Sequence, residues 1–294
     1  MKKCGVTFQI LHYGDYRLTV KCIRCLFDLD KMEYCRIVVI DNGTYSKEKV
    51  VTELGRHRFD VTYLELENNV GFSKGNNYGW RLCREDSTQD FIVVLNNDVF
   101  IYQKNFISLL YNLYKEQKFY VAGPDVFCRR KRIHTNPMSL KLFDDKMALE
   151  YINSHSSLFR EYLKELGWPY LLYKNTFGRL KGRNPSIYKS RHENALLHGC
   201  CLIFSLEFIQ LNEKVFVPET FLYAEENYLQ WRCYKNGWKT LYLPELVVEH
   251  YDSGSSKTKV LSYYSFKQKK KKQDAQKRLA LLQYIKYLQE EMDE

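Results

Sequence analysis

The sequence predicts an α/β fold in which a mostly parallel, Rossmann-like sheet is flanked by helices. Short apolar runs alternate with segments of helical character along the first half of the chain. The runs are continuously apolar, which is typical of strands covered on both faces. Polar residues directly follow three of these runs, and ligands bind at the carboxyl ends of the strands in such sheets.

The first half of the chain is expected to contain strands and helices in turn. The predicted strands are Val6–Leu11, Arg36–Ile40, Val61–Leu66 and Phe91–Leu95. The predicted helices are Tyr16–Asp28, capped by Asp15, then Lys47–Gly55 and Ser73–Cys83.

The second half begins with a change of composition. Residues 128–195 are rich in Lys, Arg, Tyr and Leu and include a helical stretch at Met147–Leu166, so we expect a helical insertion or lid. The elements expected after it are an apolar strand at Leu196–Phe204, a helix over Phe221–Gly237, and short strands at Thr240–Leu243 and Leu246–Val248. The expected boundaries are one domain over 1–256, made of 1–127, the insertion 128–195 and 196–256, and a basic helical tail over 257–294.

The distribution of charge and the cysteine content limit which classes of protein the sequence fits. The formal net charge is +10, and much of the excess lies in Arg129–Arg132, Lys174–Arg191 and Lys267–Lys272, outside the predicted sheet. A nucleic-acid-binding protein would interleave basic and aromatic residues on one face, so nucleic acid is not the expected partner. The nine cysteines, with neither a secretory signal nor an apolar run of about 20 residues, favour a reduced, cytoplasmic protein. Cys22 and Cys25 fall at helical spacing with leucines, which favours buried thiols over a metal or redox pair.

A possible metal site is indicated by two strand ends. Asn96-Asn97-Asp98 follows the fourth predicted strand, and Mg²⁺ or Mn²⁺ suits a carboxylate there because such ions prefer oxygen ligands. A simple turn is the alternative, since Asn and Asp are favoured turn residues. A single His after a strand is usually structural, but beside such a carboxylate His250 becomes a candidate second ligand.

Two further segments carry polar residues. Asn68–Gly79 holds three glycines and four asparagines, and such a segment can wrap a nucleotide or a sugar. An ordinary loop before a helix is the alternative. Glu225 and Glu226 are adjacent near the start of the predicted helix. They either complement the helix dipole or supply a general base in a partly buried site.

Taken together and in order, these segments resemble the family 2 glycosyltransferases of the GT-A fold, especially the bacterial rhamnosyltransferase-like branch. The matching segments read IVVIDNGT (37–44), NVGFSKGNNYG (69–79), VLNNDV (94–99), AGPDV (122–126), LHGCCLIF (197–204), FLYAEENYL (221–229) and VVEH (247–250). The resemblance runs from Val6 to about Ser256, apart from the insertion. Glu226 stands where the family usually has Asp, and LHYG (11–14) stands where it often has T-Y-N.

The resemblance implies a role for each candidate residue. The donor would be held by Leu11, Tyr13, Asp41, Asn69, Gly71, Lys74, Asn76, Asn77 and Asn97, with Asp41 on the base. Asp98 and His250 would bind the divalent metal, Mg²⁺ or Mn²⁺, while His198 and Gly199 would lie on the acceptor side. Glu226 would be the catalytic base, with Glu225 preceding it.

The expected reaction is one in-line displacement at the anomeric carbon, which inverts its configuration. Glu226 would take the proton of an acceptor hydroxyl as a UDP- or dTDP-linked sugar, with rhamnose one candidate, leaves its diphosphate. The acceptor would be a glycan, carried on a lipid in related enzymes, in cell-surface or capsular polysaccharide synthesis. A nucleotidyltransferase is the rival enzyme, but it needs a Gly-rich basic loop after the first strand, and LHYGDYRL has one Gly.

The tail combines a cationic run with an amphipathic helix. Leu281, Ile285, Leu288 and Met292 form one apolar stripe after Lys267–Lys272. This pattern suits peripheral attachment to the anionic inner surface of a membrane. The alternatives are a solubilising tail and a helix docked on the domain or on a second subunit of a homodimer. Acidic residues at the end of the tail weigh against the membrane.

Overall fold

The computed structural model describes residues 5–56, 59–85, 89–144, 146–148, 150, 185–251 and 263–293. Most of the expected insertion, including nearly all of Met147–Leu166, therefore lies outside the described residues. The strands are β1 Val6–His12, β2 Cys35–Asn42, β3 Asp60–Leu66, β4 Phe91–Asn96, β5 Val99–Phe100, β6 Val121–Cys128, β7 Ile133–His134, β8 His192–Glu193, β9 Cys201–Ser205 and β10 Thr240–His250. The helices are α1 Tyr16–Phe27, α2 Lys47–Leu54, α3 Phe72–Arg84, α4 Phe106–Glu116, α8 Leu206–Leu211, α9 Glu225–Lys235 and α10 Tyr263–Asp293, with the 3-10 helices η1 Met32–Tyr34 and η2 Pro185–Lys189.

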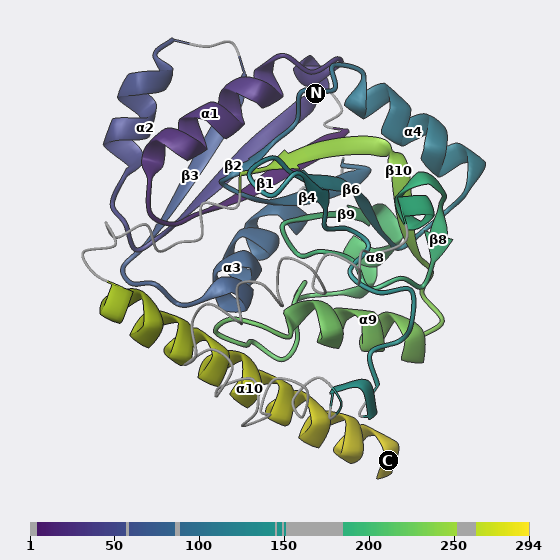
Figure 1. Cartoon of the computed structure of the whole chain (residues 1–294). Coiled ribbons are helices and arrows are strands. Elements are labelled where there is room, and N and C mark those ends of the chain that lie inside the picture. Colours follow the sequence, from purple (N-terminus) through teal and green to yellow (C-terminus); the bar gives the residue numbers. More distant parts are fainter. Residues whose placement is uncertain are drawn as a thin grey trace.

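A mixed sheet forms the centre of the molecule (Figure 1). Its strands follow the order β3-β2-β1-β4-β9-β6-β10-β5, with β7 beside β6 and β8 beside β10. The neighbours β3, β2, β1 and β4 are parallel, whereas β9 runs antiparallel to both β4 and β6. The expected parallel sheet is therefore confirmed for the first half of the chain, and the second half joins it through an antiparallel strand.

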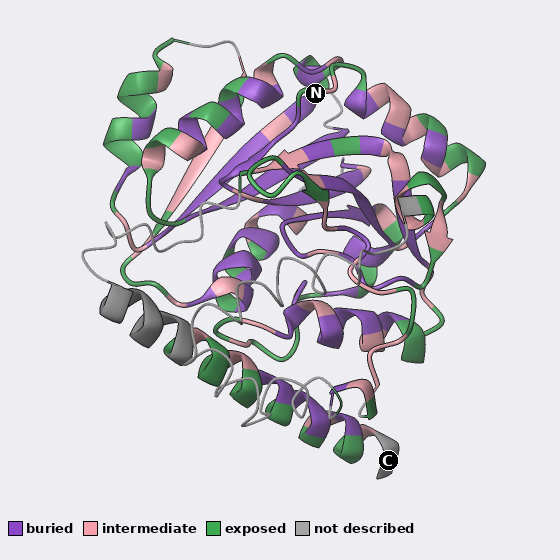
Figure 2. Cartoon of the chain, in the orientation of Figure 1, coloured by how far each residue is buried: buried purple, intermediate pink, exposed green. Residues whose placement is uncertain are grey.

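Helices cover both faces of this sheet. On one face, Ile23 of α1 and Phe106 of α4 pack in the same hydrophobic cluster as Phe8 of β1. On the other face, Trp80 of α3 and Phe208 of α8 belong to a second cluster, which also contains residues of α9. All seven residues of β1 are buried as a result (Figure 2). Covering on both faces explains the continuously apolar character of the strand sequences.

Several boundaries of helices and strands can be compared with those expected from the sequence. Asp15 caps α1 as expected, because its side chain accepts a hydrogen bond from the backbone N–H of Arg17. The helix expected from Phe221 begins only at Glu225, since Tyr223 and Ala224 have the left-handed φ values of 74° and 68°. The two short strands expected before His250 are one strand, β10, whose register shifts between Leu243 and Val247 around Pro244.

The C-terminal helix α10 lies alongside α9 (Figure 1). Leu281, Ile285 and Leu288 of the expected apolar stripe are buried in a cluster with Ala224 and Tyr228. The side chain of Met292 lies outside the described part of the chain. The stripe thus packs against the chain's own α9, which supports the docked-helix alternative, and membrane attachment through the cationic run stays a prediction.

The structure also bears on membrane crossing and on the thiols. Among the helices that the structure describes, none is long and apolar enough to cross a membrane. Cys22 and Cys25 are free and buried on α1, and burial raises the pKa of both thiols. Both are therefore helix-face cysteines of the core, as their spacing indicated.

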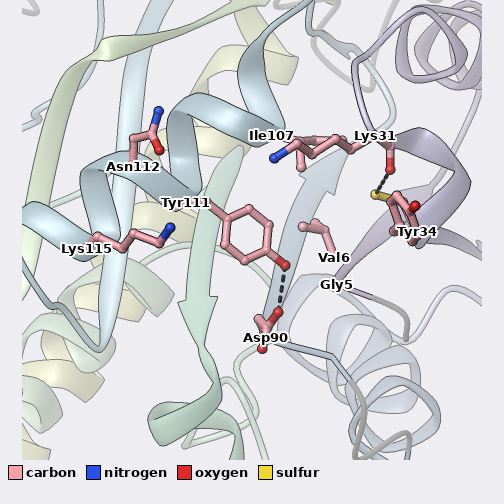
Figure 3. Close-up of a pocket in the computed structure, with 10 residues that line it drawn as sticks. Gly5, Val6, Lys31, Tyr34, Asp90, Ile107, Tyr111, Asn112 and Lys115 are labelled. Carbon is pink, nitrogen blue, oxygen red and sulfur yellow. Dashed lines mark hydrogen bonds between the residues drawn. The ribbon is translucent and has the colours of Figure 1, made fainter. Parts of the chain in front are cut away.

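A cavity of about 360 Å³ lies at the amino ends of β1 and β2, at the edge opposite the candidate residues (Figure 3). Within it the hydroxyl of Tyr111 donates a hydrogen bond to Asp90 across 2.7 Å. Its lining residues include Gly5, Val6, Lys31, Tyr34, Cys35, Ile107, Asn112 and Lys115. Because the carboxylates and imidazoles singled out in the sequence lie at the other edge, this cavity is not the candidate active site.

Candidate active site

Three strand ends bring the candidate residues to one edge of the sheet. β1 ends at His12, β2 at Asn42 and β4 at Asn96, and parallel pairing sets His12 opposite Asp41. Parallel neighbours present their carboxyl ends at the same edge. The predicted convergence of three polar strand ends on one rim is therefore confirmed.

Asp98 and His250 lie beside each other on this rim. β5 follows Asp98 and pairs with the end of β10, so that His250 sits opposite Val99. Nε2 of His250 lies 3.3 Å from Oδ1 of Asp98, and the two side chains are 12% and 10% exposed. The backbone N–H of Tyr251 also donates to the carbonyl of Asp98 across 2.9 Å. The structure thus brings the two predicted metal ligands together, and their carboxylate and imidazole are donors that divalent cations accept.

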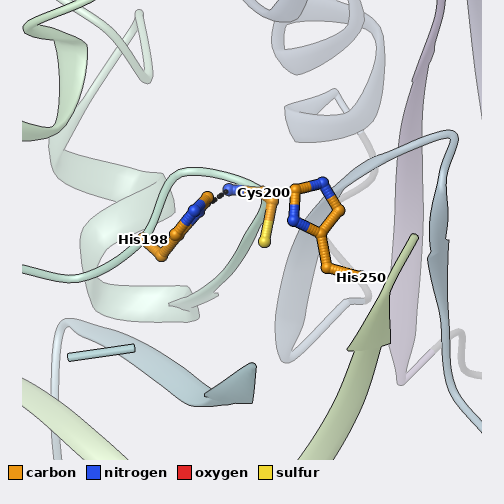
Figure 4. A group of neighbouring side chains, drawn as sticks. All are labelled: His198, Cys200 and His250. Atoms are coloured by element: carbon orange, nitrogen blue, oxygen red, sulfur yellow. Dashed lines mark hydrogen bonds between the residues drawn. The ribbon is translucent and has the colours of Figure 1, made fainter. Parts of the chain in front are cut away.

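His198 and Cys200 extend this pair into a larger cluster. The ligand atoms of His198, Cys200 and His250 all lie within 4.8 Å of one another (Figure 4). The rings of His198 and His250 meet edge to face with centroids 5.6 Å apart. Sequence analysis placed His198 on the acceptor side and missed Cys200, because a Cys next to an apolar strand has the pattern of a core residue.

Glu225 and Glu226 occupy the first turn of α9. Glu225 is 6% exposed, and its Oε2 has no hydrogen-bond partner among the described residues. Oε1 of Glu226 accepts a hydrogen bond from the backbone N–H of Gly199 across 3.2 Å. A Cβ added to Gly199 would lie only 2.7 Å from that oxygen. The predicted base and the predicted acceptor-side glycine are therefore in direct contact.

Burial controls the protonation of this pair. It raises the pKa of Glu225 well above its ordinary value, and the charge of Glu226 raises it further. Burial also raises the pKa of Glu226, but hydrogen bonds from its own backbone and from Gly199, and the charge of Lys277, partly offset that effect. The hydrogen bond from Gly199 favours the ionised form of Glu226, which is the form that a general base needs.

The segment Asn68–Gly79 is a short loop followed by a helix, as the expected helix Ser73–Cys83 implied. α3 begins at Phe72, so only residues 68–71 form a loop. A Cβ on Gly75 would lie 2.9 Å from Leu11 Cδ1, and one on Gly79 would lie 2.4 Å from Ile40 Cδ1. These two glycines let α3 approach the sheet closely, which is a packing role.

Asn76 and Asn77 are held by hydrogen bonds within the fold. Oδ1 of Asn76 accepts a hydrogen bond from the side chain of Gln9 across 3.0 Å. Asn77 exchanges hydrogen bonds of 2.8 and 3.0 Å with the backbone of Phe216. Both side chains are buried, so their amides fasten α3 to the fold, and their contact with a donor stays a prediction.

The remaining loop links the donor side of the rim to the glutamate segment. Oδ1 of Asn69 accepts from the side chain of Asn42 across 3.1 Å and from the N–H of Gly71 across 2.9 Å. Gly71 has a φ of 88°, and its Cα faces the backbone of Phe221. The N–H of Phe72 donates to the carbonyl of Phe221 across 2.7 Å. Lys74, one turn later, is exposed.

Asp41 and Asn97 are held by hydrogen bonds within the rim. Asp41 accepts from the N–H and the hydroxyl of Thr44 across 2.7 and 2.6 Å. Asn97 donates to Nδ1 of His12 across 3.2 Å and to the hydroxyl of Thr19 across 3.1 Å. Both side chains are buried, so they shape the rim, and their contact with a donor stays a prediction.

His12 is the second residue that sequence analysis missed. It is 1% exposed, and its Nε2 has no hydrogen-bond partner among the residues that the structure describes. Burial lowers its pKa, so the ring is neutral near neutral pH. Sequence analysis named its neighbours Leu11 and Tyr13 instead. Leu11 packs in the core and Tyr13 is 40% exposed, and the contact of either with a donor stays a prediction. The position of His12 at a strand end was the available signal.

Comparison with known proteins identifies the family and the fold. Residues 7–275 match the family model described as glycosyltransferase like family 2. The structure of S. aureus TarS 1–349 in complex with UDP has a TM-score of 0.54 at 14% identity, over 83% of this chain and 60% of that one. The structure of GalNAc-T7 with UDP, GalNAc and Mn²⁺ has a TM-score of 0.57 at 11% identity, over 84% and 43%. The chain thus spans 60% or less of these structures, and no curated protein matches it significantly.

Proposed function

The chain belongs to glycosyltransferase-like family 2 and has a GT-A-like mixed sheet flanked by helices, and on that premise we propose that it moves a sugar from a nucleoside diphosphate to an acceptor hydroxyl with inversion. The supporting observation is the line of contacts on one rim. Glu226 touches Gly199, Cys200 follows in the chain, and Cys200 lies beside His250, which meets Asp98. A base and a pair of metal ligands are therefore neighbours at the ligand-binding edge of the sheet.

The proposed donor is a UDP-linked sugar, with a dTDP-linked sugar as the alternative. UDP in the TarS and GalNAc-T7 structures supports the first choice. On this chain Asp41, Asn69 and the free Nε2 of His12 are the groups best placed to meet the nucleotide. Rhamnose as the sugar rests on the sequence resemblance alone, and neither comparison supports that branch. A glycan acceptor for surface polysaccharide likewise rests on the resemblance.

Asp98 and His250 would hold the divalent cation, Mg²⁺ or Mn²⁺. The two side chains fit such an ion, because an oxygen and a nitrogen donor lie 3.3 Å apart and are mostly shielded from water. The Mn²⁺ in the GalNAc-T7 structure agrees with this choice of metal. When bound, the ion would supply positive charge beside the departing diphosphate.

Glu226 would carry the proton transfer. The N–H of Gly199 orients one carboxylate oxygen, which leaves the other oxygen to accept the proton of the acceptor hydroxyl. That hydroxyl oxygen forms the new bond to the anomeric carbon as the bond to the diphosphate breaks. Burial and the neighbouring charge raise the pKa of Glu225, which favours its protonated form and leaves Glu226 as the proposed base.

The division of the chain follows from these roles. Residues 1–127 would form the donor-binding half and residues 196–256 the acceptor and catalytic half, with residues 128–195 inserted between them. His198 and Gly199 open the second half and lie against the base. This placement supports an acceptor that enters on the side of β9 and α9.

A thermal-shift panel tests the proposal. The full chain is heated with UDP-sugars, dTDP-sugars and the free nucleotides, each with Mn²⁺ or with EDTA. We expect a rise in melting temperature with one class of nucleotide sugar that needs Mn²⁺, because a ligand at 100 times its Kd stabilises the fold by about 2.7 kcal/mol. Sugar release from that donor is then measured. No shift with any donor, together with salt-dependent binding of DNA or RNA, would favour the nucleic-acid-binding alternative.

A further inference from the structure

The cluster of His198, Cys200 and His250 contains a ligand that the proposed Mg²⁺ or Mn²⁺ site does not need. Hard cations take oxygen ligands, whereas a thiolate beside imidazoles selects softer ions such as Zn²⁺. Cys200 is 1% exposed and forms no disulfide. Its sulfur nevertheless lies within 4.8 Å of a ligand atom of each of the two histidines.

We propose that His198, Cys200 and His250 form a site for a transition-metal ion of the zinc type, separate in chemistry from the Asp98–His250 site but sharing His250 with it. Zn²⁺ lies about 2.0–2.3 Å from imidazole and thiolate ligands. Ligand atoms that lie within 4.8 Å of one another therefore close around one ion with small side-chain rotations. Three protein ligands would leave a fourth position open.

The backbone already orients the first two ligands. The N–H of Cys200 donates to Nδ1 of His198 across 3.1 Å. This bond holds the ring in place and occupies Nδ1, so Nε2 of His198 would be the atom that binds the ion. Both residues precede β9, whose first residue pairs with β4 in the centre of the sheet. The two ligands thus stand on a rigid part of the fold, which favours a defined site.

The third ligand is oriented by a carboxylate. Nε2 of His250 lies 3.3 Å from Oδ1 of Asp98, and Figure 4 shows the other ring nitrogen of His250 turned toward Cys200. A metal-binding His commonly donates its second N–H to a carboxylate, which fixes its tautomer. Asp98 would play that part here. Because His250 serves both sites, a zinc-type ion and the proposed Mg²⁺ or Mn²⁺ would compete.

Titration of the full chain with Co²⁺ tests the site, because a bond between cobalt and a thiolate gives a charge-transfer absorption that oxygen and nitrogen ligands do not. We expect one Co²⁺ per chain with this absorption, displaced by Zn²⁺. Cys200→Ser should lose the absorption. Cys233→Ser, which changes another buried free cysteine, should keep it. His198→Ala retains the thiol and should bind Co²⁺ at least about tenfold more weakly, since even outer partners of metal ligands contribute that much.

Two results would overturn the proposal. One is a folded wild-type chain without the absorption at saturating Co²⁺, and the other is an unchanged absorption in Cys200→Ser. Circular dichroism shows whether Cys200→Ser folds. If it does not fold, His198→Ala becomes the deciding variant, and an unchanged Co²⁺ affinity in that variant would also overturn the proposal. Co²⁺ binding needs no sugar donor, so this outcome is independent of the thermal-shift test of the proposed function.

Discussion

The backbone N–H of Gly199 donates a hydrogen bond to Oε1 of Glu226 across 3.2 Å, which joins the segment before β9 to the first turn of α9. A methyl group on Gly199 would lie 2.7 Å from this oxygen and would push the carboxylate aside. We expect Gly199→Ala to keep its melting temperature while losing kcat by about 10²-fold, the scale of losing a general base. Adding Glu226→Asp, which is one methylene shorter, should recover part of the rate. An unchanged kcat in Gly199→Ala would contradict the role of this contact.

Removal of the base itself gives the second prediction. Glu226→Gln should still bind donor but lose kcat by about 10²-fold or more, and Glu225→Gln should affect kcat less. Because burial raises the pKa of Glu226 and the base must be ionised, the wild-type rate should rise as pH increases through that raised pKa. In Glu226→Gln, the rate measured across the same pH range should not show this rise. A dead Glu225→Gln beside an active Glu226→Gln would show that the roles are reversed.

Glu225 makes a prediction about stability. Its folded-state pKa is raised above the unfolded value by burial, so its contribution is fully present below the unfolded pKa and is lost as pH rises through the folded pKa. Each unit of difference corresponds to about 1.4 kcal/mol. Glu225→Gln should therefore be more stable than the wild type near neutral pH. Its free energy of unfolding should also change less with pH. Urea unfolding at several pH values measures the free energy of unfolding of the two proteins. If it changes with pH in the same way in both, Glu225 does not contribute the expected pH dependence.

The metal site gives a fourth prediction. EDTA should abolish sugar transfer, and Mg²⁺ or Mn²⁺ should restore it. Asp98→Asn should lose transfer and lose the Mn²⁺-dependent part of the donor's thermal shift, because a neutral amide is a weaker ligand for a hard cation. Asp30→Asn is the matched control, since Asp30 bonds to the start of α4 away from the rim. Full activity of Asp98→Asn in EDTA would exclude the site.

The strands of the first half could be predicted to within about two residues. Burial on both faces gives β1, β2 and β4 their apolar runs. The start of α9 could not be predicted, since the left-handed Tyr223 and Ala224 have no local signal. These residues precede a glutamate pair that tertiary contacts hold in place. Backbone strain of this kind commonly gathers at functional sites.

The composition of the site was predictable in part. Asp98, His250, Glu226 and Gly199 meet as the order of segments implied. The hydrogen-bond partner of Asn76 could not be predicted, because an asparagine in a glycine-rich segment gives the same pattern whether its amide faces a ligand or Gln9 of the neighbouring strand. The predicted start of this helix, Ser73, lies one residue from the observed start of α3 at Phe72, but a helix boundary does not say which neighbours the polar side chains meet.

The helix α10 gives the last prediction, because an amphipathic stripe shows that one face needs a cover but not what covers it. Leu288 is 1% exposed and packs in the cluster of Tyr228 and Ala224, beside the glutamate pair. Leu288→Ala should destabilise the fold by about 2–4 kcal/mol through the lost contacts and the cavity left behind. Leu282→Ala, on the same helix but 46% exposed, should stay within about 0.5 kcal/mol of the wild type. Urea unfolding compares the two, and equal small effects would mean that α10 is not docked on α9 in solution, which would return its apolar face to the membrane or to a second subunit.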